Sequence, residues 1–134
     1  MKIRAFTPAA AALSLFAAPA LAHHSFAMFD ATKNLTLEGT VKNFEWTNPH
    51  MWLYVMVPQA NGAPVEYPLE MMAVQGAVRL GWKPDSVKAG DKVSFEYHPL
   101  RDGHPGGQLI SVTLAGGKKL SVIPNTGNAA PRQD

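Results

Sequence analysis

The apolar pattern of residues 35–46, LTLEGTVKNFEW, constrains the fold more than any other stretch of this chain. Apolar or small residues occupy every second position from Leu35 to Val41, as in a β-strand with one buried face. The alternation then shifts by one residue, and Phe44 and Trp46 carry it on. A shift of this kind near a glycine indicates a β-bulge or a sharp bend. We therefore expect a long first strand that is bulged or bent.

The other elements follow from alternation and from turn residues. We expect a short helix over residues 73–80, closed by Gly81 at its C-terminus. Further strands are predicted over residues 51–57, 65–71, 92–98 and 108–114, with a short last strand after the Gly116–Gly117 turn. Three strands, a helix and two strands is the element order of an OB-fold, a five-stranded Greek-key barrel. The predicted fold is therefore all-β with a small inserted helix, an OB-fold-like barrel of five to six strands.

The first 22 residues have the features of a secretory signal peptide. Lys2 and Arg4 precede an apolar, alanine-rich run, and Ala20 and Ala22 occupy the small positions of an A-x-A cleavage site. We expect export to the periplasm, with no membrane span after cleavage. The predicted organisation is a signal peptide over residues 1–22, an N-terminal arm over 23–34, a barrel over 35–123 and a disordered tail over 124–134.

Removing the signal peptide changes the charge of the protein. The whole chain has 12 Lys and Arg against 10 Asp and Glu, and two of the basic residues lie in the signal peptide, which leaves 10 of each. A neutral domain lacks the basic surface that nucleic-acid binding requires, so we expect no nucleic-acid partner. The chain has no cysteine. This excludes disulfides, thiolate metal sites and cysteine nucleophiles.

Four stretches of the chain resemble a bacterial family of small exported proteins of unknown function: AHHSFAMFD, LEGTVKNFEWTNPHMWLYV, GWKPDSVKAGDKVSFEYHPLRDG and SVTLAGGKKL. The specific part of the resemblance is AHHSF at the cleavage site combined with TNPHxW. It covers nearly the whole mature chain. The resemblance implies a periplasmic protein of one domain, and it implies neither an activity nor particular site residues.

Histidines are the only concentrated chemical signal in the mature chain. They are His23, His24, His50, His98 and His104. In an OB barrel the loop between strands one and two and the loop between strands four and five help to form the binding face. The first of these loops holds His50, and His98 and His104 flank the second, so the three can converge. Neutral imidazole is the commonest metal ligand and suits copper, zinc and nickel.

The predicted cleavage site adds a second source of ligands. Cleavage after Ala22 leaves His23 with a free α-amine and an imidazole, which together can chelate one metal ion. The α-amine has a pKa of about 7.7–8.0 and imidazole of about 6.5, so both lose a proton readily near neutral pH. Such a terminus resembles the histidine brace of other exported copper proteins. Cleavage after Ala20 would place histidine third, which also chelates Cu(II) or Ni(II).

The leading hypothesis is a periplasmic protein that binds and handles a transition metal, copper first, through these five histidines. In the alternative, the histidines are incidental linker and turn residues, and the barrel is an interaction module that binds a protein or a small ligand. Its ligand face would then be Trp46, Trp52 and Tyr54. An accessory enzyme with a copper centre is a third class. Because no arrangement of carboxylates, serines or histidines has acid–base or nucleophilic logic, we expect no catalytic residue and no enzyme.

Overall fold

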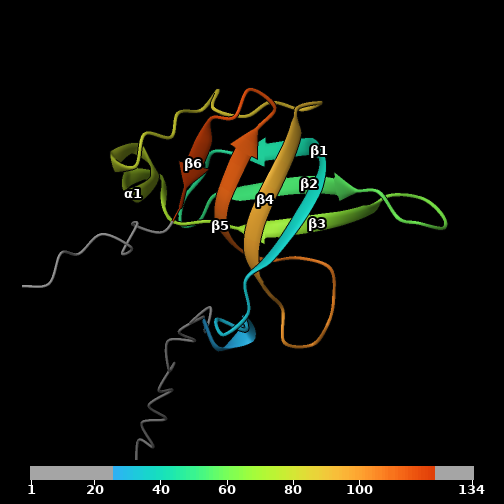
Figure 1. Cartoon of the computed structure of the whole chain (residues 1–134). Helices are drawn as coiled ribbons and strands as arrows, with labels where there is room; N and C mark the ends of the chain where they lie inside the picture. Colours follow the sequence, from blue (N-terminus) through green and yellow to red (C-terminus); the bar gives the residue numbers. More distant parts are fainter. Residues whose placement is uncertain (1–25, 123–134) are drawn as a thin grey trace, which may run out of the picture.

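The structure is a computed structural model that describes residues 26–122 (Figure 1). The predicted signal peptide, the first residues of the predicted arm with His23 and His24, and the predicted tail lie outside the described residues. The elements are η1 (Phe26–Met28), β1 (Leu35–Glu45), β2 (Trp52–Val57), β3 (Val65–Glu70), α1 (Val74–Arg79), β4 (Lys92–Pro99), β5 (Gly107–Leu114) and β6 (Lys119–Ser121). No helix in this part of the chain is long and apolar enough to cross a membrane.

The strands close into a barrel, which confirms the predicted all-β, OB-like fold. The order in the sheet is β3-β2-β1-β4-β5-β6, and β3 also pairs with β5. The closing pairing is parallel and short, joining Leu69 to Gly107 and Glu70 to Gln108. Five strands thus form the closed barrel, and β6 adds to the outer side of β5 (Figure 1). The predicted short last strand is present as this sixth strand.

The first strand is bent as its sequence predicts. Residues Leu35 to Thr40 pair with β4, and Thr40 to Glu45 pair with β2, with a register shift between Val41 and Asn43. One strand therefore serves both halves of the barrel. Gly39 lies at the close approach of β1 to β2, where an added Cβ would come within 2.5 Å of the Met56 carbonyl oxygen. The glycine is needed here because any side chain would collide with backbone.

The barrel interior is filled by the residues that alternate inward along the strands. In β2 the burial alternates strictly, and Leu53 and Val55 are fully buried while Trp52 and Tyr54 are partly exposed on the outer face. Phe95 of β4 and Val112 of β5 meet them from the other half of the sheet. The alternation of side chains along β2 therefore matches its burial.

The helix ends as predicted, at a glycine. Gly81 has φ +91°, its N–H donates to Val78 O at 3.0 Å, and the Trp82 N–H donates to Ala77 O at 3.0 Å. These two bonds form a Schellman motif, which requires the left-handed conformation that glycine adopts without strain. Trp82 is buried and its indole N–H donates to Ser121 O at 2.8 Å, so the end of α1 is attached to β6.

Candidate functional site

The loop between β1 and β2 places His50 against a buried carboxylate. Its Nδ1 contacts Oε1 of Glu70, whose side chain is only 7 % exposed. The Met71 N–H donates to Met51 O at 2.9 Å, and the Met51 N–H donates to Met72 O at 3.2 Å, so this loop lies along the chain that follows β3. His50 thus caps a carboxylate that would otherwise be buried without a partner, which is a structural role.

Glu70 corrects one expectation from the strand pattern. The alternation of side chains along β3 predicts an outward, solvent-exposed position for Glu70. The pairing of Glu70 with Trp52 does put it on the outer face. The residue is nevertheless only 5 % exposed. The reason is tertiary: the loop that carries His50 folds over it, which alternation along one strand cannot reveal.

The other two described histidines have different surroundings. At the end of β4, His98 bonds through Nδ1 to Lys33 O at 2.9 Å, which ties it to the segment before β1. In the β4–β5 loop, His104 is 77 % exposed and its Nδ1 lies 3.1 Å from Oδ2 of Asp102. The pKa of Asp102 is lowered, chiefly because its carboxylate accepts the backbone N–H of His104. Asp102 therefore stays ionised and favours the His104 tautomer whose Nε2 can bind a ligand.

The three histidines do not meet at one point. Within residues 26–122 no group of three or more His, Asp or Glu side chains is placed to hold a metal ion. The expected convergence of His50, His98 and His104 is not seen, because each ring faces a different neighbour. A histidine-rich site needs ligands from His23 and His24, which lie outside the described residues. Metal binding by the five histidines stays a prediction.

The N-terminal arm lies against the β4–β5 loop. Arg101 donates from its backbone N–H to Met28 O at 3.0 Å and from Nε to Ala27 O at 2.9 Å. A bridge between Phe29 and Leu100 extends the pairing, and the Asp30 N–H donates to Pro99 O at 2.8 Å. In Figure 1, η1 and the β4–β5 loop lie at the same end of the barrel. The start of the described chain is therefore held beside the loop that carries His104.

The carboxylate of Asp30 lies at the contact between the N-terminal arm and the β4–β5 loop. Asp30 accepts hydrogen bonds from the Thr32 N–H at 3.2 Å and the Thr32 hydroxyl at 2.6 Å, and it pairs with Lys33 at 3.2 Å. The hydroxyl bond, followed by Lys33, lowers the pKa of Asp30 from its ordinary 3.8 to about 2. Arg101 approaches the same carboxylate at 4.0 Å. Asp30 is thus ionised at neutral pH, and its oxygens are already engaged.

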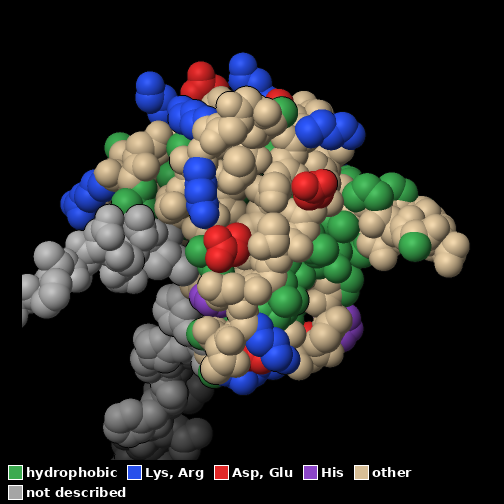
Figure 2. Space-filling model, in the orientation of Figure 1, with side chains coloured by type: hydrophobic (Ala, Val, Ile, Leu, Met, Phe, Trp, Pro, Cys, Tyr) green, Lys and Arg blue, Asp and Glu red, His purple; other side chains and the backbone are tan. Residues whose placement is uncertain are grey.

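A pocket of about 430 Å³ opens between the arm, the β4–β5 loop and the mouth of the barrel. Its walls include Leu35, Tyr67 and Tyr97 on the barrel side and Lys33 and Arg101 on the rim. Figure 2 shows basic side chains beside exposed hydrophobic ones at this end of the molecule. The pocket has a size typical of small-molecule sites and combines apolar walls with a few polar groups.

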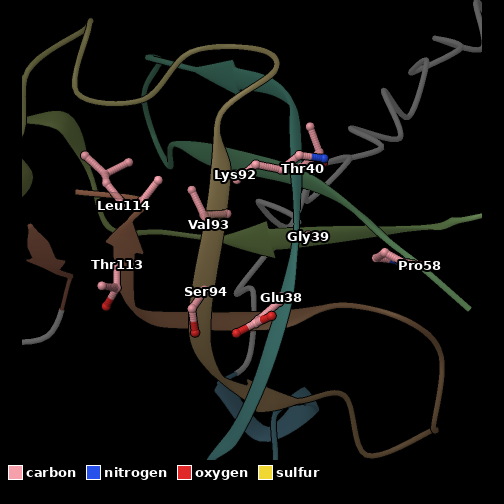
Figure 3. A pocket seen from close by; sticks show the side chains of 10 residues that line it. Glu38, Gly39, Thr40, Pro58, Lys92, Val93, Ser94, Thr113 and Leu114 are labelled. Carbon is pink, nitrogen blue, oxygen red and sulfur yellow. The ribbon is translucent and has the colours of Figure 1, made fainter. Parts of the chain in front are cut away.

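A second hollow lies on the outer surface of the sheet (Figure 3). It measures about 420 Å³ and crosses β1, β4 and β5, where Glu38, Ser94 and Thr113 are register neighbours. Lys92 at its edge donates to the Thr40 hydroxyl at 2.7 Å. No histidine or aromatic side chain lines it. Its lining side chains offer neither a ligand set for a metal nor a surface for stacking.

The predicted aromatic face is divided into two parts. Trp52 and Tyr54 stack on the outer face of β2, with ring centroids 6.4 Å apart. Burial, with the nearby carboxylate of Glu45, raises the pKa of Tyr54, so this hydroxyl stays protonated at neutral pH. Trp46 instead packs edge-on against Phe44, with ring centroids 6.0 Å apart, and contacts the hydrophobic core. The structure brings together two of the three predicted residues.

One known protein family matches the part of the chain that carries this site. The family described as a family of unknown function, DUF6152, matches residues 11–109. The chain belongs to this family. The DUF6152 match spans all five histidines and ends at Leu109, within β5. No curated protein and no solved structure matches the chain. Because the family description names no activity, the function of this DUF6152 protein must be argued from its own residues.

Sequence reasoning missed the residues that hold the arm in place. Arg101 and Asp30 were not singled out, because a loop arginine and an aspartate near a turn have no local pattern that marks them as partners. In the sequence, the pocket residue Tyr97 is an alternating apolar position within a predicted strand. Its position at the end of β4, beside a glycine-rich loop, is the one signal that points to the mouth of a barrel.

Proposed function

We propose that this DUF6152 protein is exported to the periplasm and binds a transition metal, copper first, at the N-terminal arm and the β4–β5 loop. The ligands would be His23 with its α-amine, His24 and His104. Its role is to bind and hand on the metal, without turnover. His50 and His98 are left out of this narrower set because each already bonds to another part of the barrel.

The observation that carries the proposal is the double attachment of the arm to Arg101. Three peptide steps separate His24 from Ala27, and three separate Arg101 from His104. Since consecutive Cα atoms are about 3.8 Å apart, three peptide units span at most about 11 Å. Ala27 O accepts the Nε–H of Arg101 at 2.9 Å. Chain length therefore allows the terminal histidines to reach the loop of His104.

The donor set suits copper. Three imidazoles and an amine are nitrogen ligands, which Cu(II) binds more tightly than the other divalent first-row ions. The Asp102 carboxylate accepts from Nδ1 of His104. A metal-binding imidazole is commonly oriented by a carboxylate that accepts from its other ring nitrogen in this way. The exposure of His104 gives an entering ion access to Nε2.

A copper titration of the processed protein, followed by EPR, tests the proposal. Native protein should bind one Cu(II) through nitrogen ligands, and either acetylation of the α-amine or His104→Ala should weaken binding by more than about tenfold. His98→Ala is the matched control and should leave the affinity unchanged. Binding no tighter than that of an unstructured peptide with the same N-terminus would refute the proposal.

A second function is favoured by the stacked Trp52 and Tyr54 on the outer face of β2. OB barrels often use this face for ligands through aromatic stacking. In this version the protein is an interaction module for a periplasmic protein or a small ligand. Trp52→Ala would then abolish capture of that partner and leave the copper affinity unchanged, whereas His104→Ala would do the opposite.

A further inference from the structure

The pocket at the mouth of the barrel has the properties of a second binding site, although one proposed metal ligand, His104, also lines it. It measures about 430 Å³. One wall comes from the arm, one from the β4–β5 loop, and the floor from the ends of β1, β3 and β4. Three segments distant in sequence thus enclose it, whereas the groove of Figure 3 lies across neighbouring strands of one sheet.

The floor of the pocket is apolar and aromatic. Tyr67 and Tyr97 meet edge to face with ring centroids 6.0 Å apart. Leu35 lines the same pocket and is 42 % exposed, one of few large hydrophobic side chains on the surface of the described chain. Burying this leucine against a ligand would be favourable, because apolar surface is removed from water. The floor therefore suits an aryl or alkyl group.

The Tyr97 hydroxyl adds a polar group to this floor. Tyr97 is only 4 % exposed and lines the pocket, and no buried side-chain nitrogen or oxygen atom among residues 26–122 lacks a hydrogen-bond partner. Burial, with the neighbouring Tyr67, raises its pKa, so the hydroxyl keeps its proton and can donate. A ligand oxygen in the pocket can accept a hydrogen bond from this hydroxyl.

The charged side chains at the rim of the pocket favour an anionic ligand. Lys33 and Arg101 contribute two cations and Asp30 one carboxylate, so these three groups leave a net charge of +1. The Asp30 carboxylate already accepts from Thr32 and pairs with Lys33. A cationic ligand would find no unused carboxylate there. An anionic ligand would meet two exposed basic side chains, which are 64 % and 57 % exposed for Lys33 and Arg101.

We propose that this pocket binds a small amphipathic carboxylate, with its aryl or alkyl body against Leu35, Tyr67 and Tyr97 and its carboxylate facing Lys33 and Arg101. The site shares the β4–β5 loop with the proposed metal ligands, but it needs no metal and none of the terminal histidines. The Tyr97 hydroxyl donates to the bound anion or to a water that the anion holds.

The test is a titration of the isotopically labelled, processed protein with 4-phenylbutyrate, followed by two-dimensional NMR in the presence of EDTA. Two probes of the same shape, 4-phenylbutan-1-ol and 4-phenylbutylamine, vary only the charge. We expect phenylbutyrate to shift the amide signals of residues 97–106 and of Lys33, and to bind about tenfold more tightly than the alcohol, since hydrogen bonds to charged groups are the stronger kind. The amine should bind most weakly.

Three results would overturn the proposal. They are the absence of any shift up to the solubility limit of phenylbutyrate, equal binding of all three probes, and shifts centred on Trp52 and Tyr54 instead of the pocket. The first two exclude the pocket or its charge preference, and the third moves the ligand to the outer face of β2. Because EDTA is present, none of these outcomes depends on copper.

Variants locate the contacts. Tyr97→Phe keeps the ring and should weaken phenylbutyrate by about tenfold, whereas Tyr54→Phe on the outer face should have no effect. Lys33→Gln should reduce the preference for the carboxylate over the alcohol, and Arg79→Gln on α1 is its matched control. If Tyr97→Phe fails to fold, Tyr67→Phe tests the same floor. All these variants should keep the copper affinity, so failure of this site and failure of the metal proposal are separable.

Discussion

The β1–β2 loop and the β4–β5 loop each present a histidine beside a carboxylate, yet the two pairs differ in burial. His50 covers Glu70, whose side chain is 7 % exposed, whereas His104 and Asp102 are 77 % and 62 % exposed. In the first pair the imidazole is the hydrogen-bond partner of a buried carboxyl group. In the second pair, both side chains are exposed, so water can hydrogen-bond to each of them. The same two residue types therefore hold the fold together in one loop and remain accessible to a ligand in the other.

The largest effect should come from His50→Ala. Removing the imidazole leaves the Glu70 carboxylate buried without that partner, and we expect a loss of about 2–3 kcal/mol in the free energy of unfolding. Chemical denaturation monitored by tryptophan fluorescence measures it. Adding Glu70→Gln should recover part of the loss, because a neutral amide is cheaper to bury than a carboxylate. A loss below about 0.5 kcal/mol would remove the contrast between the two loops.

A smaller loss in the free energy of unfolding is expected for Arg101→Ala in the β4–β5 loop. The substitution removes the bond from Nε to Ala27 O but keeps the backbone bond to Met28 O. One such hydrogen bond contributes about 1 kcal/mol. Hydrogen exchange of the Asp30 amide, which donates to Pro99 O, should accelerate while amides in β2 keep their protection. Uniform acceleration across the barrel would contradict a local role.

Acid should loosen the arm before it unfolds the barrel. The folded-state pKa of Asp30 is about 2, below its ordinary value of 3.8. The stabilisation from this carboxylate is therefore complete above about pH 4 and is lost as the pH falls from there through about 2. The amide signals of Thr32 and Lys33 should follow this titration. Asp30→Asn should remove the pH dependence of these signals, whereas Asp102→Asn should leave it in place.

The smallest change in stability is expected for His104→Ala. An exposed side chain whose partner is also exposed should contribute less than about 0.5 kcal/mol. Thermal unfolding should therefore be nearly unchanged, although copper affinity falls under the proposed function. A loss as large as that of His50→Ala would show that the second loop is also structural.

Much of the fold could be predicted from local patterns. Alternation located the strands, the phase shift near Gly39 located the bulge, and Gly81 located the end of the helix, because each signal depends only on neighbouring residues. The candidate site could be predicted less well. The two loops with His50 and His104 were located correctly, but not whether their side chains meet, since that depends on how each loop folds over the barrel.

The sequence by itself determined an all-β barrel with an inserted helix and histidines in its connections. Only the tertiary structure decided which of these residues are structural. Glu70 lies on an outward position and is buried, and Arg101 lies in an exposed loop and holds the arm. The physical reason is that alternation fixes the direction of a side chain relative to its own strand. What covers that side chain is set by contacts between segments far apart in the chain.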